Sequence, residues 1–283
     1  MQQVFKYSAE FFARPQEEKD SLEWYSAKAN RGYTAHGREK VTQLEEKGDV
    51  EALRQAVPDL KESYEVGREG EPGCPNMWLP DDTEGGWGAK FKSEMLSFHD
   101  ECKGLHIEIM RAIAAGLGID VSWFDSYTDQ GDNTLRLLHY PPVKKDVFEK
   151  NPNQVRAGEH SDYGSITLLF QDSRGGLQVE SPRGTFVDAT PIPDTIVINA
   201  GDLLARWSND SIKSTKHRVV EPPLPPSPDQ DNTYPARYSV AYFCNPNFNR
   251  MVEVIPNTVG KEGRKYESVN SGDYLVMRLE ATY

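Results

Sequence analysis

Residues 157–165 read AGEHSDYGS and place His160, one spacer residue and Asp162 before the apolar run 166–170. Alternate residues of a strand point to the same face, so we expect the imidazole and the carboxylate to converge. A converging pair of this kind can hold a metal ion, orient a proton or form a buried hydrogen bond. The spacing of the two residues is compatible with all three.

A second histidine, His217, begins the run HRVV. If its strand faces that of His160, the side chains of His160, Asp162 and His217 meet on one side of the interior. Two imidazoles and one carboxylate on one face of an octahedron are the ligand set of non-haem Fe(II) oxygenases, with three positions left open. The alternative is a hydrogen-bonded pair in the core, because an HxD sequence followed by a distant histidine has many chance matches.

Arg237 and Ser239 stand at alternate positions of the run RYSVAYF, so both face the same way on the strand that we expect there. A guanidinium beside a hydroxyl suits a carboxylate, which it binds through charge-assisted hydrogen bonds. A dicarboxylate could then chelate the metal at one end and bind Arg237 at the other. The alternative is an arginine paired with one of the many acidic residues.

The other histidines give weaker signals. His99 and His106 fall on a long helix and off its apolar stripe, which predicts that both face solvent. His36 lies in the loop GYTAHGREK and is expected to be exposed. His139 lies in the strand LLHYPP beside Tyr140 and is harder to assign.

The chain divides into two parts with different sequence patterns, and the elements that these patterns predict position the residues named above. Up to residue 133 the pattern predicts helices, including a charged helix over 41–57 and an amphipathic helix over 91–117 that Gly118 ends. Between them, residues 66–88 are rich in Pro and Gly and predict a long irregular crossing, a candidate lid. From about residue 134, eight short β-rich runs follow, bounded by turn residues. They are LRLLHY, SITLLFQD, GLQVES, TFVDAT, TIVINA, DLLARW, HRVVEP and YSVAYFCNP.

These patterns predict an α+β, mainly β architecture. Residues 1–133 are expected to form a helical N-terminal portion, and residues 134–283 a jelly roll, or double-stranded β-helix, on which it packs. The two parts together are expected to form one structural unit.

Composition narrows the class of partner. The formal charge of -12 disfavours nucleic acid and anionic membranes, which require clustered Lys and Arg. Three cysteines without CxxC spacing predict neither a disulfide framework nor a zinc knuckle. No apolar stretch is long enough to span a membrane, and no signal peptide is apparent. We therefore expect a cytoplasmic protein that binds a small molecule.

Five motifs in a fixed order resemble a known family. HSDYGSITLL, GGLQV, NAGDLLARWSND, STKHRV and RYSVAYF are similar to the 2-oxoglutarate- and Fe(II)-dependent dioxygenases of the isopenicillin-N-synthase-like superfamily, especially its fungal members. The resemblance extends from about Phe5 to the C-terminal RLEATY. The two strands with which the family usually begins, reading Pro-x-Ile-Asp and ending in Asn-His-Gly, do not precede VFKYSAEFF.

The resemblance implies roles for individual residues. His160, Asp162 and His217 match the iron ligands, and Arg237 and Ser239 match the residues that hold the distal carboxylate of 2-oxoglutarate. Tyr140 matches a tyrosine that also contacts this co-substrate in the family's Asn-x-Tyr-Pro stretch, although Leu138 replaces the asparagine.

The implied activity is that of an oxidoreductase. It would couple the oxidative decarboxylation of 2-oxoglutarate, with O2 at a non-haem Fe(II), to hydroxylation, desaturation, demethylation or ring rearrangement of a small substrate such as a secondary metabolite. The alternatives are an Fe(II) oxidase of the same fold that does not use 2-oxoglutarate, and a non-catalytic protein that binds a small ligand. Candidates for lining the substrate pocket are Phe170, Leu204, Trp207 and Phe243.

Overall fold

The computed structural model describes residues 1–39, 59–223 and 232–282. The charged helix expected over 41–57 lies outside the described residues.

Two antiparallel sheets form the centre of the molecule, and neighbouring strands in each pair by hydrogen bonds. The smaller sheet has the order β5 (Ala157–His160), β10 (His217–Val219), β7 (Leu177–Glu180) and β8 (Phe186–Asp188). The larger sheet has the order β1 (Gly32–Thr34), β2 (Glu62–Gly67), β3 (Thr134–Tyr140), β12 (Arg237–Cys244), β6 (Ile166–Gln171) and β9 (Val197–Ala200).

Apolar side chains from both sheets pack against one another in the space between them. They come from β3 and β12 of the larger sheet and from β5, β7 and β10 of the smaller one. They are Leu138, Tyr140, Ala157, Leu177, Val219 and Ala241. Alternate residues of a strand face opposite sides, so the other faces of β3, β6 and β12 are free to pack against helices. The predicted jelly roll is confirmed.

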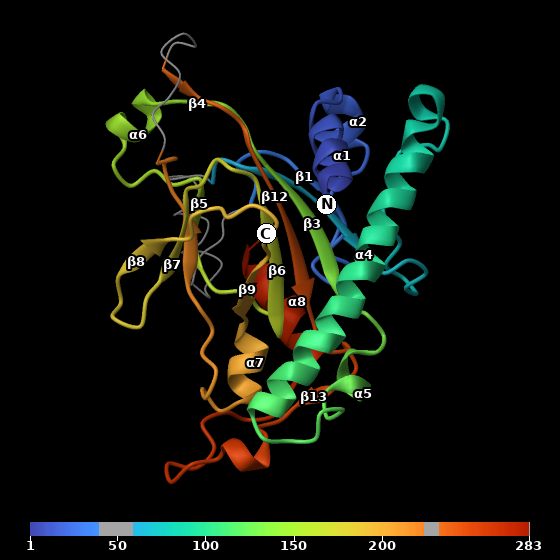
Figure 1. The fold of residues 1–283 in the computed structure, drawn as a ribbon. Helices are drawn as coiled ribbons and strands as arrows, with labels where there is room; N and C mark the ends of the chain where they lie inside the picture. The colour runs from blue at the N-terminus through green and yellow to red at the C-terminus, as the bar shows by residue number, and fades with distance from the viewer. Residues whose placement is uncertain (40–58, 224–231, 283) are drawn as a thin grey trace.

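The long helix α4 (Thr83–Gly116) runs diagonally across one face of the larger sheet, and α8 (Ser271–Thr282) is seen behind the strands (Figure 1). Glu84, Gly85 and Gly86 have non-helical backbone angles, so the regular part of α4 follows them. Its end agrees with the prediction, because Gly118 adopts a φ of +68° just beyond it, a conformation that favours glycine.

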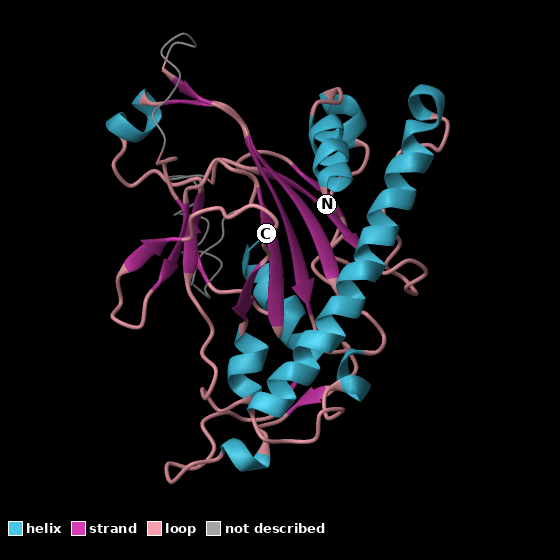
Figure 2. Ribbon diagram, in the orientation of Figure 1, coloured by secondary structure: helices cyan, strands magenta, loops and turns pink. Residues whose placement is uncertain are grey.

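The N-terminal helix α1 (Gln2–Phe12) packs beside α4, with the rings of Phe11 and Phe91 stacked at 5.4 Å. Helices gather around the larger sheet, whereas loops surround most of the smaller sheet (Figure 2). The remaining elements are short. They are α2 (Gln16–Asp20), α5 (Asp125–Thr128), α6 (Asp146–Lys150), α7 (Asp202–Trp207), the 3-10 helix η2 (Pro256–Thr258), and the paired strands β4 (Val143–Lys144) with β11 (Thr233–Tyr234) and β13 (Met251–Val252) with β14 (Val269–Asn270).

Two expectations about elements were wrong. The run DLLARW forms the helix α7 and not a strand, because Leu203, Leu204 and Trp207 follow a helical spacing that buries all three on one side. The irregular crossing is also shorter than expected, since β2 continues to Gly67 and joins the larger sheet beside β3. Residues 1–133 thus supply two strands as well as helices, and the division of the chain at residue 133 stays a prediction.

Among the described residues, no helix has both the length and the apolar character that crossing a bilayer requires. The cytoplasmic location stays a prediction.

Candidate metal and co-substrate site

The structure brings His160, Asp162 and His217 together. His217 pairs directly opposite His160 in the β5–β10 ladder, and their ring centroids lie 4.2 Å apart. Asp162 follows β5 by two residues, and its Oδ1 lies 3.7 Å from His217 Nε2. One potential ligand atom from each residue lies within 4.8 Å of the other two. The expectation that the three side chains converge is confirmed.

Hydrogen bonds set the orientation of both imidazoles. Nδ1 of His160 lies 2.7 Å from the carbonyl of Gly158, and Nδ1 of His217 lies 3.1 Å from the carbonyl of Thr215. A carbonyl can only accept, so each Nδ1 carries a proton, and Nε2 is the nitrogen that each ring leaves for a metal. Burial lowers the pKa of His160 to about 3, with a further contribution from His217. The imidazole of His160 is therefore neutral, as a metal ligand must be.

The carboxylate of Asp162 is held at one oxygen and open at the other. Thr167 Oγ1 and Asn199 Nδ2 both donate to its Oδ2, at 2.6 and 2.7 Å. Burial alone would raise the pKa of Asp162, but the two imidazoles and these two donors lower it. Two imidazole nitrogens and one carboxylate oxygen in this arrangement fit Fe(II) with positions to spare. No sequence signal identified Thr167 and Asn199, because their strands, β6 and β9, meet Asp162 only in the folded chain.

Arg237, Ser239 and Tyr140 also come together. Arg237 pairs opposite Tyr140, and its guanidinium lies 4.8 Å from the Tyr140 ring centroid. Its Nη1 donates to Ser239 Oγ at 3.2 Å. Arg237, Ser239, Ala241 and Phe243 alternate along β12, and Ala241 belongs to the interior cluster, so the whole row faces the space between the sheets.

A cavity of about 620 Å³ adjoins the triad. His160, Asp162 and Phe243 line its inner end together with Arg136 and Glu39. Of the four residues expected to line a substrate pocket, only Phe243 does so. The other three, Phe170, Leu204 and Trp207, are buried in the core beneath the helices.

The inner wall of this cavity contains a buried charge cluster. The guanidinium of Arg136 lies 5.2 Å from the centroid of the Phe243 ring. It pairs with Glu39 at 3.0 Å and with Glu65 at 2.7 Å, and Lys61 pairs with Glu39. Burial would raise the pKa of Glu39, but Arg136 and Lys61 lower it to about 2. Glu39 is therefore ionised, and the cavity presents a cation and an anion side by side.

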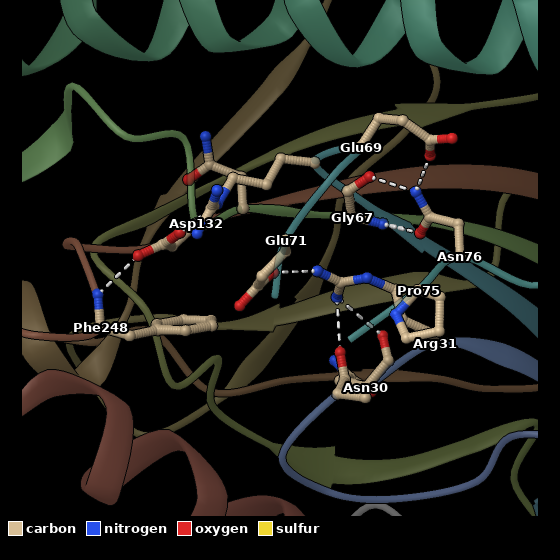
Figure 3. A network of polar contacts seen from close by, with 12 residues as sticks. Asn30, Arg31, Gly67, Glu69, Glu71, Pro75, Asn76, Asp132 and Phe248 are labelled. Atoms are coloured by element: carbon tan, nitrogen blue, oxygen red, sulfur yellow. Dashed lines mark hydrogen bonds and ion pairs between the residues drawn. The ribbon is translucent and has the colours of Figure 1, made fainter. Parts of the chain in front are cut away.

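The mouth of the cavity is built from three segments, which are residues 27–30, residues 71–74 and α8. Figure 3 shows how the first two are joined: Arg31 Nη2 donates to Glu71 at 2.7 Å, and Arg31 Nη1 donates to the carbonyls of Ala29 and Asn30. In the same view, Oδ2 of Asp132 accepts a hydrogen bond from the backbone N–H of Phe248 at 2.8 Å. The irregular crossing after β2 is thus tied down at the mouth by buried polar contacts.

The remaining histidines separate into exposed and structural ones. His36 is exposed, as expected. His99 and His106 do not face solvent: their side chains are 2 % and 0 % exposed. The spacing of Met95, His99, Cys102, His106 and Met110 is itself helical, so both histidines lie on the buried stripe. The fourth, His139, binds Glu62 Oε1 at 2.7 Å, away from the triad.

Comparisons with known proteins agree with this geometry. The profile of the 2OG-Fe(II) oxygenase superfamily matches residues 131–246, and that of the non-haem dioxygenase in morphine synthesis N-terminal region matches residues 1–81. A 2-oxoglutarate-dependent dioxygenase of Aspergillus rugulosus, htyE, is 35% identical over 99% of this chain and 85% of its own length.

Two solved structures of one full-length Neurospora crassa protein are also similar. The first, in complex with alpha-KG and thymine, is 61% identical with a TM-score of 0.88, over 100% of this chain and 83% of that chain. The second, in complex with alpha-KG and 5-formyluracil, is 57% identical with a TM-score of 0.86, over 99% and 81%. The resemblance inferred from the motifs is confirmed: the chain is a 2-oxoglutarate-dependent dioxygenase that uses Fe(II) and O2, and it belongs to the 2OG-Fe(II) oxygenase superfamily.

Proposed function

We propose that this dioxygenase oxidises the carbon attached at C5 of a free pyrimidine base such as thymine. The observation that carries the proposal is the 61% identity, over the whole chain, with a structure that contains alpha-KG and thymine. A second structure contains 5-formyluracil, which is thymine with its methyl carbon at a higher oxidation state. One cavity that accepts both would suit stepwise oxidation of the same carbon.

The cavity wall supports a planar, polar ring. Phe243 and Tyr163 line it beside the triad and offer aromatic surface for stacking. A uracil edge alternates carbonyl acceptors with an N–H donor, and Arg136 with Glu39 offers a donor beside an acceptor.

Within this proposal, His160, Asp162 and His217 hold the iron, Arg237 and Ser239 bind the distal carboxylate of 2-oxoglutarate, and Tyr140 contacts the same co-substrate. When bound, Fe(II) and 2-oxoglutarate supply the chemistry that splits O2, with one oxygen atom going to succinate and the other to the substrate carbon. The protein's own part is to keep the imidazole of His160 neutral, to fix Asp162 through Thr167 and Asn199, and to hold the base so that its C5 substituent faces the triad.

The test is substrate-dependent succinate formation by the iron-loaded enzyme, with products identified by mass. Each two-electron oxidation of the C5 substituent of thymine or of 5-formyluracil should give one succinate, whereas uracil, which has no carbon attached at C5, should give little. His217→Ala and Asp162→Ala should abolish turnover.

Arg136→Met should raise the KM for thymine about tenfold or more, the cost of losing a charged hydrogen bond, while 2-oxoglutarate binding stays intact. Arg111→Met, on the outer side of α4, is the matched control, and its KM should not change. Absence of succinate with every 5-substituted uracil, in protein that still binds Fe(II) and 2-oxoglutarate, would exclude the proposed substrate class.

A further inference from the structure

Arg156, the residue before β5, has a buried side chain that no described residue pairs with. The residue is 0 % exposed, and none of its three guanidinium nitrogens has a hydrogen-bond partner in the described part of the chain. A buried charge without a counter-charge is costly, and proteins normally pair it or neutralise it. A buried guanidinium in this state is therefore suited to bind an anion.

The fold places Arg156 beside the co-substrate residues. Its backbone N–H donates to the carbonyl of Val219 at 2.7 Å, which fixes it at the end of the β5–β10 ladder. The next residue, Ala157, packs with Tyr140 in the interior cluster. After burial, the strongest influence on Arg156 is the positive charge of Arg237, and together they lower the pKa of Arg156 to about 10.

Arg237 itself has no carboxylate partner among the described residues. Its guanidinium is 1 % exposed and donates to three neutral oxygens, those of Gly175, Gln171 and Ser239. The carboxylate that acts on Arg156 from a distance, Asp172, is already bound to the backbone N–H groups of Tyr238 and Arg174. Two buried like charges thus share one region, and neither forms an ion pair with a residue that the structure describes.

We propose that Arg156 supplies a second guanidinium to the site that holds the distal carboxylate of 2-oxoglutarate, beside Arg237 and Ser239. This inference rests on the co-substrate role proposed above for those two residues. A carboxylate has about four lone-pair positions, more than one arginine and one hydroxyl fill. A second guanidinium uses the remaining ones, and a 2-oxo acid without the distal carboxylate would leave both buried guanidiniums without an anion. Arg156 therefore helps the enzyme to select 2-oxoglutarate from 2-oxo acids that lack the distal carboxylate.

The test measures binding without turnover or pyrimidine. Anaerobic Fe(II)-loaded protein is titrated with 2-oxoglutarate and with 2-oxopentanoate, which has the same chain length but no distal carboxylate, by calorimetry and by the visible band of the chelate. In Arg156→Met, the affinity for 2-oxoglutarate should fall by about 30-fold or more, the lower range for truncating one member of a buried charge pair. The affinity for 2-oxopentanoate should stay within about twofold of the wild type, a factor small beside the cost of a buried charge.

Stability of the ligand-free protein separates this role from a structural one. Because Arg156 has no described partner to lose, Arg156→Met should unfold at the same urea concentration as the wild type or at a higher one. Arg31→Met is the matched control, since Arg31 is equally buried but bound to Glu71. It should be destabilised and should bind 2-oxoglutarate normally once folded.

Arg156→Lys keeps the positive charge but loses the planar guanidinium, so it should retain part of the preference for 2-oxoglutarate over 2-oxopentanoate. It also allows the test if Arg156→Met is expressed poorly. The proposal is overturned if 2-oxoglutarate binds Arg156→Met as tightly as the wild type. It is equally overturned if either variant loses affinity for both 2-oxo acids alike, or if Arg156→Met is as destabilised as Arg31→Met.

Discussion

At the scale of single residues, the group that each imidazole nitrogen faces distinguishes the histidines that we propose bind iron from a structural histidine. In His160 and His217, Nδ1 donates to a nearby carbonyl, and one ligand atom of each residue lies within 4.8 Å of a ligand atom of Asp162. His106 instead directs Nε2 to Ser165 Oγ at 3.2 Å in a fully buried position, where burial lowers its pKa to about 3. Residue type is the same in all three; only the surroundings differ.

The buried position of His106 makes the protein sensitive to acid. Its pKa in the folded state lies below the ordinary value of 6.5, so the unfolded chain binds the extra proton first. The stability contributed by neutral His106 is complete above pH 6.5 and is lost as pH falls toward 3. By pH 5 the loss is about 2 kcal/mol, at about 1.4 kcal/mol for each pH unit below 6.5.

Urea unfolding of the wild type and of His106→Leu at pH 7.5 and pH 5 checks this. Other groups titrate in both proteins, so only the difference between them counts, and the wild type should lose about 2 kcal/mol more than the variant. Parallel losses in the two proteins would show that His106 is protonated without cost in the fold.

At the scale of the element, α8 closes the cavity and is held by a short chain of contacts. Arg278 Nη1 donates to Asp202 Oδ2 of α7 at 2.6 Å. Its guanidinium also lies 4.3 Å from the ring centroid of Tyr163, whose hydroxyl bonds Thr282 Oγ1 at 2.8 Å. Tyr163 directly follows Asp162, so one end of α8 is coupled to the loop that carries the carboxylate of the triad.

Arg278→Met should therefore loosen α8 and affect the pyrimidine before the co-substrate. We expect the KM for thymine to rise about tenfold, the value of a hydrogen bond to a charged group, with little change in the affinity for 2-oxoglutarate. Hydrogen exchange should increase along α8, and Arg111→Met should change neither quantity. Equal loss of affinity for both ligands would mean that α8 supports the whole fold and not the cavity mouth.

Helices and strands with a clear hydrophobic periodicity could be predicted from the sequence. Contacts that depend on the register between paired strands could not. The stripe from Phe91 to Leu117 gave α4 and its glycine end, and the β-rich runs gave seven of the eight expected strands. DLLARW was misassigned because six residues are too few to separate a strand from a helix by apolar content. The donors to Asp162 and the position of Arg156 depend on how β5, β6, β9 and β10 pair, which no local pattern encodes.

At the scale of the whole molecule, the net charge of the chain is negative, whereas the buried region that we propose for the co-substrate is positive. The chain carries a formal charge of -12, whereas the buried region around Arg237 and Arg156 is positive. 2-Oxoglutarate is a dianion, so the surface should repel it before it reaches the buried arginines that we propose bind it. Thymine is neutral at pH 7 and is subject to neither effect.

Salt should therefore accelerate co-substrate binding. Raising the ionic strength from about 0.01 to 0.1 M shortens the Debye length from about 30 to 10 Å, which screens the surface more than the buried arginines. Stopped-flow mixing under anaerobic conditions should show the association rate of 2-oxoglutarate rising with salt and its dissociation rate nearly constant, while thymine association does not change. An association rate that falls with salt would instead mean that the positive interior attracts the dianion through the cavity mouth, and that the surface charge is too dispersed to oppose it.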